Sequence, residues 1–149
     1  YHDVVGCNSR LDSIQAAILS IKLKRLDQYN RSRNEVADFY DRAFANCASL
    51  LTPLRSSFSS HVFHQYTLKL TTHSREALQA QLLAAGIPSM IYYPIPAHRQ
   101  KMFSGFQLDA LQLPLTEALC EQVISLPIHT EMDEQQLEYI IAHVLSFFK

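Results

Sequence analysis

Residues 11–28 place the strongest constraint on the fold, because they predict a helix with an unusually broad apolar face. Apolar side chains recur there at three- and four-residue spacing, in Leu11, Ile14, Ile18 and Ile21. A helix on the surface of a small domain shows a narrower apolar stripe. We therefore expect this helix to be buried between two partners, and to pack on something outside this chain.

A second helix is predicted at about residues 31–46, and it completes an N-terminal helix pair over residues 11–46. Its apolar residues follow the helical spacing, in Val36, Phe39, Tyr40, Ala43 and Phe44. The polar stretch at residues 55–60 is predicted to be a loop. This loop separates the helix pair from the rest of the chain.

Residues 62–149 alternate between strand and helix signals. Apolar and polar residues alternate over residues 66–70, which predicts a half-buried strand. Ser74 is a typical N-cap for a helix over residues 75–85, and Gly86 is placed to end that helix in a left-handed conformation. This segment therefore begins with a strand followed by a helix.

Four further elements complete this region. Residues 88–93 are short, apolar and aromatic, and predict a second strand. Residues 115–123 predict a helix, and residues 124–128 alternate as a third strand. The last helix begins at Asp133, with Gln136 three residues later as its capping-box partner. The apolar stripe of that helix is formed by Leu137, Ile140, Ile141, Val144, Leu145 and Phe148.

The order of these elements predicts an α+β fold. We expect one domain over residues 1–149, made of the helix pair 11–46 and an α+β core at residues 62–149. In that core, a small mixed sheet of about three strands is covered by helices.

The composition excludes several classes of function. The formal net charge is −1 and charged residues are scattered, so a nucleic-acid groove or a membrane-surface patch is not expected. Three widely spaced cysteines fit neither a disulfide framework nor a zinc site, which favours a reduced, cytoplasmic protein. Three glycines are too few for a phosphate-binding glycine loop. The chain opens on Tyr1 without an initiator methionine, and we expect it to be a piece of a longer protein.

Asn8 and Arg10 are the first candidate site residues. At the start of a helix, an amide usually caps the first turn and an arginine usually lies on the surface. The alternative is an anion site, because amide and guanidinium donors at a helix start suit a phosphate or a carboxylate.

A second group of candidates follows the predicted second strand, in Tyr92, Tyr93 and His98. Base rates favour buried aromatic residues and an exposed loop histidine there. A functional loop is the alternative, since its prolines stiffen the backbone and fix polar side chains at little entropic cost. A zinc site built from histidines is a distant third possibility, in His61, His64, His98 and His129.

Read together and in order, these segments resemble a known family. The sequence GCNSRLDSIQAAIL at residues 6–19 closely resembles the G-x-N-x-R-(L/M)-x-x-(I/L)-Q-A-A motif of the DegT/DnrJ/EryC1/StrS aminotransferases. Four later segments resemble the family in order and spacing: HQY at 64–66, GIP at 86–88, YYPIPAHRQ at 92–100 and LPIH at 126–129. The resemblance covers essentially the whole chain.

The resemblance implies the C-terminal small domain of a fold-type I enzyme that uses pyridoxal 5′-phosphate (PLP) and works as a homodimer. In the family, the amide at the position of Asn8 reaches the cofactor phosphate of the neighbouring subunit. The residues at the positions of Arg10, Tyr92, Tyr93 and His98 lie at the substrate. The implied reaction transfers an amino group, from glutamate, to a keto group of a nucleotide-linked sugar.

The resemblance also indicates what this chain lacks. The family's Schiff-base lysine belongs to a larger N-terminal domain, so no catalytic residue is assigned here and the chain alone is expected to be inactive. Tyr92 departs from the family, in which many members carry histidine at that position. A sugar dehydratase of the same family, and a non-catalytic binding or dimerisation module, remain alternatives.

Overall fold

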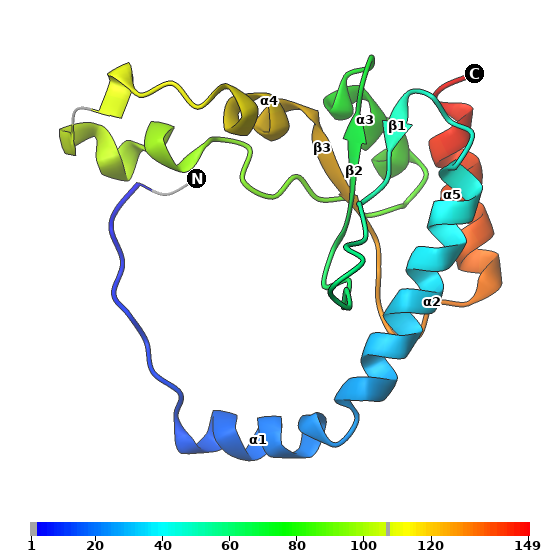
Figure 1. Ribbon diagram of the computed structural model, residues 1–149, viewed down its shortest axis with the longest axis horizontal. Coiled ribbons are helices and arrows are strands. Elements are labelled where there is room, and N and C mark those ends of the chain that lie inside the picture. The colour runs from blue at the N-terminus through cyan, green and yellow to red at the C-terminus, as the bar shows by residue number, and fades with distance from the viewer. Residues whose placement is uncertain (1–2, 107) are drawn as a thin grey trace.

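The computed structural model describes residues 3–106 and 108–149. An extended arm at residues 3–12, here called the arm, leads into helix α1 (Ser13–Leu23), which is followed by the longer helix α2 (Leu26–Phe44). Helix α2 is the first element of the body, which also contains strands β1 (Leu50–Leu51), β2 (Tyr66–Leu70) and β3 (Val123–Leu126). Its other helices are α3 (Arg75–Ala84), α4 (Pro114–Gln122) and α5 (Glu134–Ser146), with three short 3-10 helices at Ala97–Arg99, Lys101–Phe106 and Leu108–Ala110. Figure 1 shows arm, α1, body and 3-10 segment arranged as an open ring.

The sheet has the order β1-β2-β3, and both pairs are antiparallel. Leu50 lies opposite Leu70, and Tyr66 lies opposite Leu126. Alternate residues of β2 are fully buried, as the alternating sequence predicts. The predicted α+β fold with three strands is therefore confirmed.

The core lies where α2, α3 and α5 meet the sheet. Helix α2 packs along α5, and α3 packs against both α5 and β3. The largest fully buried side chains come from all of these elements and from the loop before β2, in Tyr40, Phe44, Phe63, Tyr66, Leu68, Leu70, Leu78, Leu82, Ile124 and Val144. This region alone buries enough apolar surface to make a core of its own.

The predicted helix caps of the body are confirmed. The Ser74 side chain accepts a hydrogen bond from the backbone N–H of Ala77, and α3 gives way to Gly86 at φ 72°. Asp133 and Gln136 form both hydrogen bonds of a capping box at the start of α5. The starts of both helices could be predicted from the sequence because each cap involves only residues within one helical turn.

Three predictions about elements are wrong. The predicted helix 11–28 ends at Leu23, and α2 begins at Leu26 rather than at residue 31, after a turn in which the N–H of Arg25 donates to the carbonyl of Lys22. The predicted strand at residues 88–93 is irregular apart from a bridge between Met90 and Ser125. A turn without glycine or proline leaves no composition signal, and a strand needs a continuous partner that β3 supplies at one residue only.

The prediction that the sheet is mixed is also wrong, because both strand pairs are antiparallel. With residues 88–93 outside the sheet, its third member is β1, whose two residues pair antiparallel with β2. A two-residue strand carries no detectable alternation, so the sequence could not reveal it.

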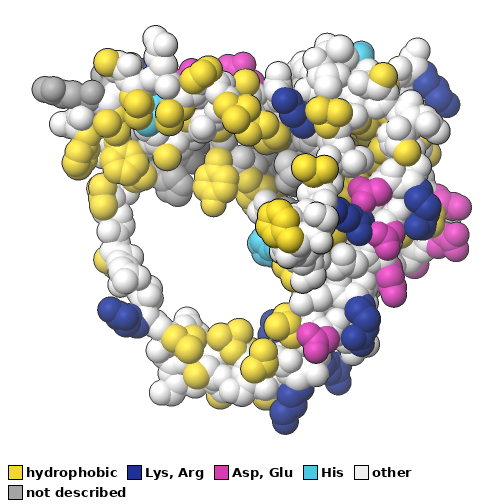
Figure 2. Space-filling model, viewed as in Figure 1, with side chains coloured by type: hydrophobic (Ala, Val, Ile, Leu, Met, Phe, Trp, Pro, Cys, Tyr) yellow, Lys and Arg dark blue, Asp and Glu magenta, His cyan; other side chains and the backbone are white. Residues whose placement is uncertain are grey.

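The arm and α1 contrast with this body, because none of the residues of α1 is buried. Its apolar side chains are exposed over a large part of their surface, for example Ile14 at 75%, Ile18 at 51% and Ile21 at 72%. Figure 2 shows apolar side chains along this helix, facing the opening of the ring and the outside. No part of the chain that the structure describes covers this helix. Its burial between two partners therefore stays a prediction.

Candidate functional site

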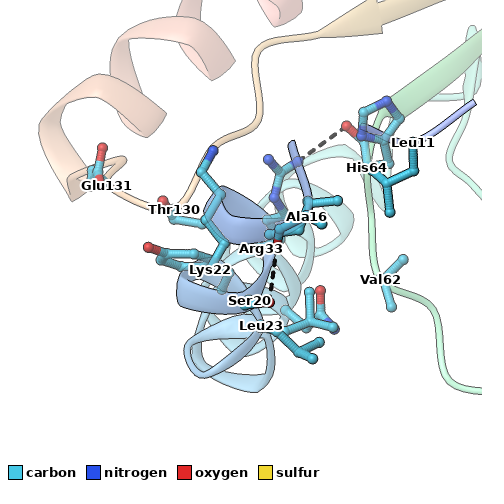
Figure 3. Close-up of a pocket in the computed structure, with 14 residues that line it drawn as sticks. Leu11, Ala16, Ser20, Lys22, Leu23, Arg33, Val62, His64, Thr130 and Glu131 are labelled. Carbon is cyan, nitrogen blue, oxygen red and sulfur yellow. Dashed lines mark hydrogen bonds between the residues drawn. The ribbon is translucent and has the colours of Figure 1, made fainter. Parts of the chain in front are cut away.

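A groove of about 860 Å³ lies where the chain turns between α1 and α2. Apolar side chains from both helices form most of its wall, including Leu19, Leu23 and Leu26. Lys22, Arg33 and His64 supply polar groups, and Figure 3 shows Lys22 near Thr130 and His64 across the groove from Thr130 and Glu131. None of the five predicted site residues lines this groove.

Arg33 and Asn34 of α2 hold the segment before β2 in place. The Arg33 guanidinium donates to the backbone carbonyls of Phe63 (3.2 Å) and His64 (3.1 Å), and the Asn34 amide donates to the carbonyl of His61 (2.8 Å). Phe63 has a left-handed backbone, with φ 46°, although it is not glycine. These contacts fix the position of His64. Polar residues on an amphipathic helix were the one sign of them in the sequence.

A polar cluster secures the same segment from the other side. The Tyr66 hydroxyl donates to Asp41 at 2.6 Å, and Arg55 pairs with both Asp38 and Asp41 at 2.7 Å. Burial, reinforced by the Asp41 carboxylate, raises the pKa of Tyr66 well above its ordinary value. The phenol therefore remains a hydrogen-bond donor at any physiological pH. Arg55 also lies over the Phe63 ring, 4.7 Å from its centroid.

Asn8 and Arg10 lie on the exposed arm ahead of α1. The helix cap is Asp12, which accepts from the N–H of Gln15 at 2.8 Å, so the capping role considered for Asn8 falls to a different residue. Within the described residues, the side chains of Asn8 and Arg10 have no hydrogen bond or ion pair. Their donors are thus available to a ligand or to another surface.

Tyr92 is the predicted site residue that lines a cavity in the body. It shares a small cavity of 220 Å³ with His64, Ser89 and Ser125. The cavity lies beside the Met90–Ser125 bridge, in which each residue's N–H donates to the other's carbonyl at 3.0 and 2.8 Å. The structure therefore brings Tyr92 and His64, which are far apart in the sequence, to the lining of one cavity.

Tyr93 is displayed to solvent from an uncommon backbone conformation. Its φ is 56° and its side chain is 72% exposed. A bulky residue with a positive φ is strained, and such residues concentrate at functional sites. The following proline, Pro94, restricts this residue further.

His98 differs from both tyrosines because it is buried, with 8% of its surface exposed. Its Nε2 lies 3.0 Å from a carboxylate oxygen of Glu117 at the start of α4. The hydrogen bond from His98, assisted by the backbone N–H of Leu113 and by Arg99, holds the pKa of the Glu117 carboxyl below its usual range. Glu117 was not predicted from the sequence, since it lies 19 residues away from its partner.

The structure gathers no metal centre from the predicted histidines. Among residues 3–106 and 108–149, no three His, Cys, Asp or Glu side chains are grouped so that they could hold a metal ion. His61 accepts a hydrogen bond from the N–H of Phe63, and His129 accepts one from the N–H of Glu131. In the same residues, no helix combines the length and the apolar character needed to cross a bilayer.

Comparison with protein families gives one match. A model of the DegT/DnrJ/EryC1/StrS aminotransferase family matches residues 1–145. Among characterised proteins, the chain is 41% identical over 140 residues to a UDP-N-acetyl-3-dehydro-alpha-D-glucosamine 3-aminotransferase of Acidithiobacillus ferrooxidans, covering 94% of this chain and 37% of that protein. It is 38% identical over 151 residues to a pleiotropic regulatory protein of Geobacillus stearothermophilus, covering 100% of this chain and 40% of that protein.

Among solved structures, the chain is similar to S. venezuelae DesV, crystallised in complex with a ketimine intermediate. The TM-score is 0.87 at 32% identity, covering 100% of this chain and 40% of DesV. The chain thus spans about 40% of the length of the relatives that it matches. Their similarity extends over the arm, α1 and the body together.

Proposed function

Because the chain belongs to the DegT/DnrJ/EryC1/StrS aminotransferase family, we propose that it forms part of a PLP-dependent enzyme that aminates a nucleotide-linked keto sugar. The amino donor in this proposal is glutamate. The observation that carries it is the family match over residues 1–145, which includes both the arm with Asn8 and the loop with Tyr92. The aminotransferase named in the comparison supports amination over dehydration.

The described residues fit one side of a PLP phosphate site. A phosphate needs directed N–H donors, and Asn8 and Arg10 carry such donors without a partner among the described residues. Exposed on an extended arm, they cannot surround an anion alone, and in this proposal the rest of the site comes from another part of the full-length enzyme. When bound, PLP supplies the electron sink for the chemistry at the carbon that carries nitrogen.

We assign distinct tasks to the residues of this chain. Asn8 donates to the cofactor phosphate in the neighbouring subunit's site, and Arg10 binds a carboxylate of the donor or a group of the substrate. Tyr92 and Tyr93 offer aromatic faces to the sugar, a role that their exposed rings and the adjoining cavity support. His98 belongs to the same loop but, unlike the two exposed tyrosines, it is buried.

The proposed enzyme is a homodimer whose interface covers the exposed apolar side chains of α1. Large contiguous apolar surface on a protein marks an interaction site, and α1 exposes Ile14, Ile18 and Ile21 together. Covering α1 also brings the arm against a second surface. This arrangement places Asn8 and Arg10 within reach of a site that this chain does not contain.

The test is a PLP absorbance titration of residues 1–149 beside the full-length protein, followed by borohydride reduction and peptide mapping. We expect only the full-length protein to retain a covalent PLP–lysine adduct, and to aminate a nucleotide-linked keto sugar with glutamate. An adduct formed on this chain alone, at Lys101 for instance, would contradict the proposal. Release of the substrate's hydroxyl group without amination would identify a dehydratase instead.

A further inference from the structure

We propose that Glu117 is a positioning residue that fixes the loop at residues 92–100, here called the substrate loop, through His98. The proposal rests on the proposed function, because it assumes that Tyr92 and Tyr93 of this loop face the sugar. Glu117 lies in the first turn of α4, outside every motif identified in the sequence. It touches neither the cofactor nor the substrate in this account.

The contacts of Glu117 converge on one oxygen atom. Its Oε1 accepts from His98 Nε2 at 3.0 Å, lies 3.5 Å from a guanidinium nitrogen of Arg99, and accepts from the backbone N–H of Leu113 at 3.4 Å. Two of these partners belong to the substrate loop and the third is the N-cap of α4. The carboxylate therefore joins the loop directly to the start of a helix.

The same loop is attached to the body at its other end. Met90, just before the loop, exchanges two backbone hydrogen bonds with Ser125 of β3. Just after His98, Gln100 closes the loop on itself, because its amide donates to the carbonyl of Ile95 at 2.9 Å and its side chain is buried. Tyr92 and Tyr93 thus lie between a strand anchor at Met90 and the Glu117–His98 anchor.

The chemistry of the loop makes a side-chain anchor necessary. Pro94 and Pro96 have no backbone N–H, so they cannot join a sheet ladder, and the predicted strand here does not form. Tyr93 is also held at a positive φ, which persists only where the surroundings restrain it. A buried histidine bonded to a carboxylate supplies such a restraint.

The charge on Glu117 strengthens this anchor. His98 above all, then the N–H of Leu113 and the cation of Arg99, lower the pKa of the carboxyl, so it is ionised at neutral pH. Its place in the first turn of α4 is favourable for a negative charge as well. Hydrogen bonds to an ionised acceptor are stronger than those between neutral groups.

The experiment compares full-length enzymes that carry Glu117→Ala, Glu117→Gln, or the matched controls Glu121→Ala and Glu121→Gln. Glu121 is exposed on the same helix and has no partner among the described residues. Hydrogen exchange of peptides over residues 92–103 reports the order of the loop, and steady-state kinetics report KM for the sugar and for glutamate separately.

We expect Glu117→Ala to speed exchange at the amides of Arg99 and Gln100 and to raise KM for the sugar about 10-fold, with KM for glutamate changed less than about 2-fold. Glu117→Gln retains an acceptor oxygen and is expected to restore most of both properties. A merely structural role would lower kcat with both substrates and would not be rescued in this way.

Exchange in Glu117→Ala equal to that in Glu121→Ala overturns the proposal, and so does an unchanged KM for the sugar. If Glu117→Ala does not fold, the single variants Glu117→Gln and His98→Asn are compared instead. Hydrogen exchange over residues 92–103 should then be faster in His98→Asn than in Glu117→Gln, and equal exchange overturns the proposal. Failure of the unmodified enzyme to aminate any keto sugar overturns the proposed function instead, and is recognised because it is independent of Glu117.

Discussion

The arm with α1 and the body formed by α2 to α5 differ in how they use apolar residues. In the body, apolar side chains of helices and strands meet in one core, with Tyr40, Leu68 and Val144 fully buried. In α1, equally apolar residues such as Ile14 and Ile18 remain exposed, although the helix itself is well capped by Asp12 and Gln15. Both regions therefore contain capped helices with apolar side chains, but those side chains are buried in the body and exposed in α1.

This difference shows that a capped, apolar helix specifies its own structure but not its partner. No residue of α1 is buried by the part of the body that the structure describes. An exposed ion pair of 3.6 Å between Asp3 and Lys101 is a weak link between the arm and the 3-10 helix Lys101–Phe106. The candidate site residues are likewise divided between the arm and the body. Asn8 and Arg10 lie on the uncovered arm, whereas Tyr92, Tyr93 and His98 lie on the body.

The largest effect is expected from the core of the body. Leu68→Ala removes a fully buried side chain from the central strand β2, and should lower the free energy of unfolding by about 2–5 kcal/mol. Urea denaturation of residues 1–149 and of the full-length protein should give this loss in both. A loss below about 1 kcal/mol in both proteins would contradict the core described here.

The same truncation in α1 should separate the two regions. Ile18→Ala is expected to change the stability of residues 1–149 by less than about 0.5 kcal/mol, because the side chain is half exposed. In the assembled full-length protein, where the proposed interface covers α1, the cost should rise to about 2–4 kcal/mol. Equal losses in the two proteins would mean that nothing covers this helix.

Glycine substitutions distinguish the two regions through their backbone conformation. Gly86 ends α3 at φ 72° and a Cβ there would meet no atom within 4 Å, so Gly86→Ala should cost about 1–2 kcal/mol through the left-handed conformation alone. Gly6 on the arm is the matched control, since its surroundings are equally open. Gly6→Ala is expected to be neutral in residues 1–149, and a similar loss at both sites would contradict this account.

The smallest effect is expected from the pH dependence of Glu117. Because its pKa is lowered in the folded protein, its ionised form adds stability above the ordinary pKa of a glutamate, and this contribution disappears as the pH falls through the lowered value. The stability difference between the unmodified protein and Glu117→Gln should thus be constant near neutrality, begin to shrink near the ordinary glutamate pKa of about 4.3, and vanish only below the lowered pKa. A difference that persists at lower pH, or that Glu121→Gln reproduces, would rule out the anchor as its source.

Much of the fold follows from signals within a few residues. The capping residues Ser74 and Asp133 and the alternation in β2 correctly predicted α3, α5 and the central strand. Contacts that join distant segments could not be predicted in this way. The two-residue strand β1 has no pattern, and the turn at Lys24 and Arg25 contains neither glycine nor proline.

The candidate site shows the same limit. The resemblance to the aminotransferase family pointed to Asn8, Arg10, Tyr92, Tyr93 and His98, whereas residue type and spacing alone favoured ordinary structural roles for them. They gave no sign that His98 is buried against Glu117 or that Tyr92 shares a cavity with His64. Such contacts depend on how the chain returns to itself, which periodicity does not reveal.

Mixed dimers can show whether the arm serves a site outside its own subunit. Full-length Asn8→Ala would be combined with a full-length variant that lacks the catalytic lysine, each inactive or nearly so by itself. If Asn8 donates to the neighbouring subunit's site, a mixed dimer contains one intact site, and activity should return to about half that of the unmodified dimer. If mixing restores no activity although mixed dimers form, Asn8 serves its own subunit and the account is wrong.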